Sequence, residues 1–186
     1  MPAHNSSADL RHCLDALDAS DLPRATWELI VVDDSSDDST PDVAQGSADH
    51  EIRLTGGARG PAFARNRGAE IAHAPIIVFV DADVAVHADA LTRILSDLDE
   101  RPVDAVFGSY DDTPAHPGTV SQYRNLLHHF VHQQSAHEVE SFWAGCGAVR
   151  RDAFLAAGEF DELRYRFPEM EDVELGYRLR DAGSRI

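Results

Sequence analysis

The sequence predicts an α/β fold in which a mostly parallel sheet is flanked by helices. Residues 76–80 read Ile-Ile-Val-Phe-Val, five apolar residues that are typical of a strand buried on both faces. Residues 27–32, Trp-Glu-Leu-Ile-Val-Val, form a second such run. Strand and helix patterns alternate along the first half of the chain, which predicts right-handed crossovers and parallel pairing of the strands.

Caps, apolar spacing and turn residues set the expected boundaries of the elements. Residues 1–5 look like the end of a strand, and a helix follows from Ser6 or Ser7, where apolar residues begin to recur at helical spacing. Pro41 and Pro168 suit the first turn of a helix, and Gly183 suits a C-terminal stop. The later elements are expected as strands at 27–32, 51–54, 76–80, 103–110 and, as strand or tight turn, 141–150, and as helices from about 40, at 62–73, 88–100, 120–134, 153–157 and 169–182.

Length and composition narrow the class of protein. A chain of 186 residues is long enough for one domain, 1–186, with its own core. Its formal net charge of −17 argues against nucleic acid as a partner and against a broadly anionic surface. All 16 basic residues are arginine, which excludes Schiff-base chemistry and a phosphate-loop lysine.

Cysteine usage and hydropathy indicate where the protein acts. Cys13 and Cys146 are far apart and in unlike contexts, which suggests buried thiols in a reducing compartment. No apolar run approaches the roughly 20 residues of a membrane span, and no signal peptide is visible. We therefore expect a cytoplasmic protein, for which peripheral association with the inner face of a membrane stays open.

Paired acids follow both apolar runs. Asp33 and Asp34 come after the run at 27–32, and Asp81 and Asp83 come after the run at 76–80. The carboxyl ends of parallel strands meet at one edge, where ligands of open α/β sheets bind. Four carboxylates there would repel one another unless a cation is present. A divalent ion would offset the negative charge of the carboxylates and also that of a bound diphosphate. The alternative, acids that merely cap the following turns, is less able to account for two clusters.

Other polar and aromatic residues have both structural and functional interpretations. Glu171 and Asp172 suit the positive end of a helix dipole, but beside a metal–diphosphate site one of them could be a general base. Arg65 could hold phosphate oxygens or form an ordinary ion pair. Trp143, close to Gly145, could belong to the core or line an acceptor pocket.

The helix expected at 120–134 is rich in histidine. His128 and His132 lie one turn apart, beside His129, which invites a zinc interpretation. No glutamate occupies the position that zinc proteases require, and the run has no third well-spaced ligand. A solvated or substrate-facing helix is therefore the favoured interpretation.

Six short segments carry a resemblance to a known family. They are Pro2-Ala3-His4-Asn5, Val32-Asp33-Asp34-Ser35-Ser36-Asp37-Asp38-Ser39-Thr40, Ala64-Arg65-Asn66-Arg67-Gly68, Asp81-Ala82-Asp83, Gly158-Glu159-Phe160-Asp161-Glu162 and Glu171-Asp172-Val173-Glu174-Leu175. In this order, across essentially the whole chain, they resemble motifs of the family 2 glycosyltransferases, whose nucleotide-sugar-binding fold is called GT-A. The resemblance implies a GT-A-like (Rossmann-like) domain.

The resemblance also implies a donor site. Asp34 would bind the nucleotide base, with His4 in the place of an aromatic residue that usually packs against it. Asp83, helped by Asp81, would bind Mg²⁺ or Mn²⁺ on the diphosphate, and Arg65 would contact the donor. The implied donor is a nucleotide-diphosphate sugar, with uridine as the guessed base.

The implied reaction is transfer of a sugar with inversion. Asp172 would be the catalytic base that deprotonates the acceptor hydroxyl. Glu171 and the segment of Trp143 and Gly145 would bind the acceptor, for which a glycan or a lipid-linked saccharide is expected. Two other function classes stay open: an inactive nucleotide-sugar-binding remnant, and a nucleotidyltransferase on a similar fold.

The chain departs from the family pattern at several places. His4, Ser35 and Glu159 replace the usual motif residues, and the family's first strand, just before Pro2, is absent. Family members also usually continue beyond Ile186 with a further strand. A missing strand would leave an edge of the sheet open beside the nucleotide site, as in a fragment, a truncated gene model or a homodimer that completes the sheet.

Overall fold

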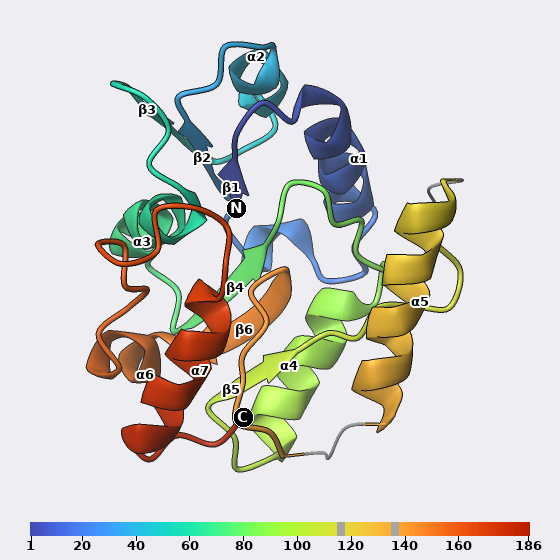
Figure 1. Ribbon diagram of the computed structural model, residues 1–186, viewed down its shortest axis with the longest axis vertical. Coiled ribbons are helices and arrows are strands. Elements are labelled where there is room, and N and C mark those ends of the chain that lie inside the picture. The colour runs from blue at the N-terminus through green and yellow to red at the C-terminus, as the bar shows by residue number, and fades with distance from the viewer. Residues whose placement is uncertain (115–117, 135–137) are drawn as a thin grey trace.

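A computed structural model describes residues 1–114, 118–134 and 138–186 of the chain (Figure 1). The first three strands form a parallel sheet in the order β1-β2-β3. They are β1 (Pro2–Ala3), β2 (Ile30–Asp34) and β3 (His50–Leu54). Every β2 residue has a partner on β3, so the register brings Asp34 opposite Leu54 at the carboxyl end of the sheet.

The other three described strands form a second sheet in the order β4-β6-β5. They are β4 (Ile76–Val80), β5 (Ala105–Phe107) and β6 (Cys146–Arg150), and both pairings with β6 are antiparallel. The α/β class is confirmed, but the expectation that parallel pairing extends to residues 76–80 is wrong. The physical reason is that β6, from the segment expected as strand or tight turn, returns in the opposite direction and pairs with β4 along its whole length.

The helices flank these sheets (Figure 1). They are α1 (Ser7–Asp18), the 3₁₀ turn η1 (Arg24–Thr26), α2 (Thr40–Ala44), α3 (Pro61–Ile71), α4 (Ala90–Glu100), α5 (Thr119–Gln134), α6 (Arg151–Ala156) and α7 (Glu171–Asp181). The helix expected at 169–182 begins later, because the Glu169 amide donates to the Glu171 carboxylate in the turn before α7. Within the described ranges, no helix is long and apolar enough to cross a membrane.

The core on one side of β4 is built from phenylalanine rings. Phe79 of β4 contacts the rings of Phe160, Phe154 and Phe142, with centroids 5.1, 5.4 and 6.4 Å apart. These side chains come from β4, from α6 and from the segments before β6 and α7. The ring contacts therefore fix the start of α7 relative to the carboxyl end of β4, where the expected site residues lie.

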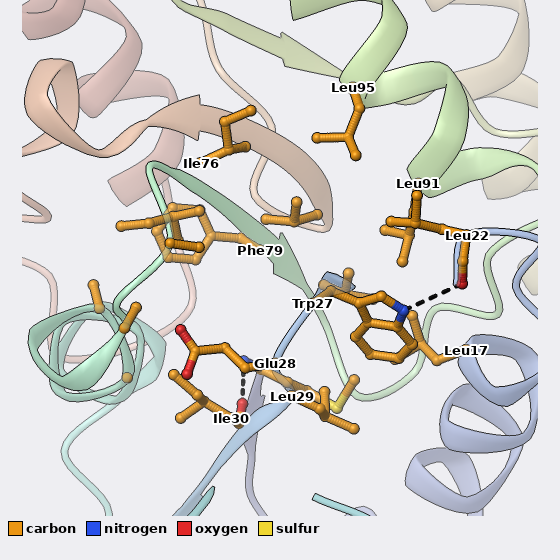
Figure 2. Close-up of a pocket in the computed structure, with 18 of the residues that line it drawn as sticks. Leu17, Leu22, Trp27, Glu28, Leu29, Ile30, Ile76, Phe79, Leu91 and Leu95 are labelled. Atoms are coloured by element: carbon orange, nitrogen blue, oxygen red, sulfur yellow. Dashed lines mark hydrogen bonds between the residues drawn. The ribbon is translucent and has the colours of Figure 1, made fainter. Parts of the chain in front are cut away.

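An apolar groove of about 270 Å³ lies between β2 and β4 (Figure 2). Leu17, Trp27, Ile76 and Leu91 are among the side chains that line it. The amino group of Met1 lies at this groove and donates to the Ile30 carbonyl, and burial, together with the Arg65 charge, lowers its pKa to about 6. β1 and β4 each end a sheet, and completion of the sheet by a homodimer stays a prediction.

Candidate active site

The expected site residues lie at three element ends. Asp34 ends β2, the Asp81–Asp83 segment follows β4, and Glu171 opens α7. The loop before β6 closes the arrangement, because the Asp81 amide donates to the Gly145 carbonyl at 3.0 Å. The structure thus brings together acids that are up to 137 residues apart in the numbering of the chain, as the element order predicts for Asp34 and Asp81 but not for Glu171.

Asp34 is tied to the loop before α3. Its carboxylate is buried and accepts hydrogen bonds from the Arg59 amide at 2.8 Å and the Gly60 amide at 2.7 Å. The exposed His4 ring lies against the same residue, with Nδ1 2.8 Å from the Asp34 carbonyl oxygen. His4 and Asp34 therefore share one corner of the site, and their contact with a donor stays a prediction.

Gly60, in the loop before α3, occupies a position that only glycine can fill. It has φ +95°, and a Cβ atom there would strike the backbone carbonyl of Arg166. Only glycine fits this close approach, which brings the Gly60 amide to Asp34. The Gly-Pro pair that opens α3 was the available sequence signal, since glycine often stands where two backbones meet.

Arg65 bridges two of the expected acids. Its guanidinium donates to Asp81 Oδ1 at 2.6 Å and to Glu171 Oε1 at 2.8 Å, and its side chain is only 4% exposed. Burial lowers the pKa of Arg65, but the Asp81 and Glu171 carboxylates outweigh that effect and raise it. Arg65 therefore stays charged and holds α7 against the end of β4.

Glu171 is buried and fully engaged by the protein. One carboxylate oxygen accepts from Arg65 and the other from the Glu169 amide at 3.0 Å. This geometry suits a residue that positions the start of α7, and contact with an acceptor stays a prediction for Glu171.

Asp83 lies two residues after Asp81 and is exposed on the segment that follows β4. Partial desolvation, together with the charge of Asp81, raises the pKa of its carboxyl. Within the described ranges, no group of three or more histidine, cysteine, aspartate or glutamate residues could hold a metal by itself. Two carboxylates nevertheless fit Mg²⁺ or Mn²⁺, because such ions usually take few protein ligands and fill the remaining positions with phosphate and water oxygens.

Asp172 is half-buried and separate from the Arg65 bridge. Its Oδ2 accepts from the Ala144 amide at 3.2 Å and its Oδ1 from the Val173 amide at 2.8 Å. Burial raises the pKa of the Asp172 carboxyl despite these bonds. A carboxylate with a raised pKa and a fixed orientation is suited to take a proton from a hydroxyl group.

Aromatic rings form a wall beside the acids. Trp143 has the rings of His128 and His132 at centroid distances of 5.0 Å each, and Tyr110 stacks on His128 at 5.2 Å. Burial, with the negative charges of Asp83 and other nearby acids, raises the pKa of Tyr110. Sequence reasoning missed Tyr110, which lies in a loop without a motif. The histidines contact rings in this wall, and the substrate-facing interpretation of their helix stays a prediction.

Comparisons with known proteins support a single family. The model of the family described as Glycosyl transferase family 2 matches residues 1–157. Glycosyltransferase AglE of Haloferax volcanii is 29% identical over 126 residues, which cover 66% of this chain and 41% of AglE. Both the family and the expected α/β GT-A class are thus confirmed.

Two solved structures show the same fold. The mannosyltransferase PcManGT from Pyrobaculum calidifontis, in complex with GDP-Man and Mn²⁺, superposes with a TM-score of 0.72 and 23% identity, over 99% of this chain and 51% of that one. S. aureus TarS 1-349, in complex with UDP-GlcNAc, superposes with a TM-score of 0.73 and 20% identity, over 96% of this chain and 51% of that one. The chain thus spans about half the length, or less, of the proteins that it resembles. Because the family match covers most of its residues, it belongs to the family 2 glycosyltransferases.

Proposed function

We propose that this chain binds a nucleotide-diphosphate sugar and transfers the sugar to an acceptor hydroxyl with inversion. The observation that carries the proposal is that two of the four acids around Arg65 form ion pairs with it and two do not. One acid of each motif, Asp81 and Glu171, pairs with its guanidinium, whereas no basic side chain of residues 1–114, 118–134 and 138–186 forms an ion pair with Asp83 or Asp172, whose pKa values are raised. The site therefore offers one carboxylate for a cation and another, held apart, for a proton.

Asp83 and Asp81 Oδ2 would hold the divalent ion, since Asp81 Oδ1 is bound to Arg65. When bound, Mg²⁺ or Mn²⁺ supplies charge that stabilises the departing nucleoside diphosphate. Asp34, the backbone at Arg59 and Gly60, and the exposed His4 ring would bind the nucleotide. PcManGT holds a guanosine donor and TarS a uridine donor, so the base in this protein remains our guess of uridine.

Asp172 would supply the base. In the proposed step, the acceptor oxygen forms a bond to the anomeric carbon while the bond from that carbon to the diphosphate oxygen breaks. The acceptor proton moves to an Asp172 carboxylate oxygen, and the electron pair of the broken bond leaves with the nucleoside diphosphate. Attack from the face opposite the leaving group inverts the anomeric centre and needs no covalent intermediate on the protein.

Trp143, Gly145 and the adjacent rings would line the acceptor side. A flat indole beside polar imidazoles suits the apolar face and the hydroxyls of a saccharide. A free glycan and a lipid-linked saccharide both present such a ring. Replacing Trp143 with Ala should therefore weaken acceptor-dependent turnover and leave donor binding unchanged.

Calorimetric titration of UDP with and without Mn²⁺ tests the donor site. We expect the wild type to bind UDP more tightly with Mn²⁺, and Asp83→Ala to lose that gain, with roughly tenfold weaker binding or more. Asp99→Ala, which removes an exposed acid on α4, is the matched control and should bind like the wild type. Failure of the folded protein to bind either UDP or GDP would contradict the donor site.

Product analysis separates the remaining alternatives. A transferase should release UDP and a glycosylated acceptor from a UDP-sugar. Pyrophosphate release from a nucleoside triphosphate and a sugar phosphate would point instead to a nucleotidyltransferase. Donor binding without turnover against a panel of sugar and lipid-linked acceptors would favour an inactive binding protein.

A further inference from the structure

The outer face of α5 carries a row of exposed apolar side chains. Val120, Tyr123 and Phe130 are 68, 66 and 62% exposed, and Leu127 and Val131 are also exposed. Their positions, i, i+3, i+7, i+10 and i+11, share one face of a helix. No residue of α5 is buried, and the helix lies at the edge of the molecule (Figure 1).

The inner face of α5 fixes this orientation. Asn125 donates to the Asp111 carbonyl at 2.7 Å, and His129 Nδ1 lies 2.7 Å from the Tyr110 carbonyl oxygen. His128 and His132 place their rings against Trp143. The polar and aromatic residues therefore face the protein, and the apolar row is left outside.

The charge of α5 contrasts with that of the whole chain. The chain has 33 acidic residues among 186, yet residues 119–134 include none. The exposed Arg124 borders the apolar row and gives it a positive charge. At physiological salt, the interaction between exposed charges more than about 8 Å apart is largely screened. A surface in contact with α5 would therefore interact mainly with the charge on that helix and less with the distant acids of the chain.

The size of this face disfavours a second copy as its occupant. A helix of 16 residues is about 24 Å long and 10 Å wide, so its outer face offers about 240 Å². A stable protein interface buries about 800 Å² on each partner. A narrow apolar row with aromatic residues and no acids suits instead a helix that lies in the headgroup region of a bilayer.

We propose that the outer face of α5 binds a lipid bilayer surface, with Tyr123, Leu127 and Phe130 inserted among the headgroups and Arg124 beside anionic lipid phosphates. This surface lies on the opposite side of α5 from Trp143. The proposal goes beyond sugar transfer, because lipid binding needs neither a donor nor an acceptor. An experiment can therefore contradict bilayer binding by α5 without contradicting sugar transfer, and the reverse.

Flotation with lipid vesicles tests the proposal on the purified full chain. Vesicles of phosphatidylcholine alone and of phosphatidylcholine with phosphatidylglycerol are the probes. We expect the wild type to float with both, and more tightly with the anionic ones. The double variant Leu127→Ser/Phe130→Ser should bind the vesicles at least about tenfold more weakly than the wild type. Arg124→Gln should weaken binding to the anionic vesicles alone, by roughly fivefold.

A matched control removes the same side-chain types elsewhere. Leu163→Ser/Phe167→Ser changes a leucine and a phenylalanine that are 77 and 71% exposed on the segment before α7, and it should float like the wild type. Circular dichroism confirms that each variant is folded. Absence of wild-type flotation, or equal loss in both double variants, would overturn the proposal. If the wild type does not float but self-associates in light scattering, and only the α5 double variant abolishes that self-association, the face would be assigned to a second copy.

Discussion

Removal of the Arg65 charge should destabilise the fold through the acids that it leaves behind. In Arg65→Gln, Glu171 stays in a site where its side chain is 6% exposed and loses its cation. Asp81, at 33% exposed, can recover part of its interaction energy from water. Breaking a buried ion pair by removing one partner costs about 3–5 kcal/mol, and the exposure of Asp81 argues for about 3 kcal/mol here.

This free energy corresponds to a clear thermal shift. For a domain of this size, 1 kcal/mol changes the Tm by about 2–4 °C, so Arg65→Gln should lower the Tm by roughly 6–12 °C. Arg67→Gln is the control on the same helix, because Arg67 is 29% exposed and pairs with Glu70 and Glu162 near the surface. Its cost should stay below about 1 kcal/mol.

The pH dependence of the Arg65→Gln defect tests its cause. Without the guanidinium, the Glu171 carboxylate is a buried charge that has lost its ion-pair partner. Protonation removes that charge, so the penalty of Arg65→Gln should be largest at neutral pH and should shrink on acidification. Urea unfolding of both proteins from neutral to acidic pH measures the difference. A loss below about 1 kcal/mol, or one that does not change with pH, would refute the buried bridge.

Three further substitutions have definite expected outcomes. Asp172→Asn should lower turnover by about 10²–10⁴-fold at unchanged donor affinity. Because burial raises the pKa of Asp172, a pH–rate profile of the wild type should show turnover falling on acidification at a pH above the usual aspartate range. Thermal melts at neutral pH should show the variant to be at least as stable as the wild type. Glu159→Gly should stabilise the fold by about 1 kcal/mol in urea, because Glu159 has φ +60°. Gly147→Ala should cost about 1–3 kcal/mol, because its Cβ would strike the backbone carbonyl of Trp143 and lie 2.7 Å from the Phe142 ring, and equal urea midpoints would contradict this packing.

The parts of the site that sequence reasoning anticipated depend on element ends. Asp34 ends β2 and Asp81 follows β4, and the carboxyl ends of strands are where ligands of open α/β sheets bind. The departures from the family motifs were also visible in the sequence. Ser35 and Glu159 stand where the motif has glycine, and both adopt positive φ, at 62 and 60°. The backbone thus keeps a conformation that favours glycine after the side chain has changed.

The parts that could not be predicted depend on contacts between distant segments. Arg65 and Glu171 are 106 residues apart, and no spacing rule relates a residue of α3 to one of α7. Tyr110 lies near the acids on a loop whose path is not encoded in a local pattern. The antiparallel partner of β4 likewise depends on where the chain returns after α5, because periodicity identifies a strand but not its neighbour.

The Arg65 bridge explains why each motif has two acids. Asp81, Asp83, Glu171 and Asp172 would together place four negative charges near one guanidinium, which leaves three in excess. Arg65 pairs with one acid from each motif, so the bridge keeps one negative charge and Asp83 and Asp172, whose pKa values are raised, carry the other two. A diphosphate cannot approach such a site favourably without a cation, and a divalent ion at Asp83 would remove two of the three excess charges. The remaining charge would be that of Asp172, which is the state that a general base requires before it accepts a proton.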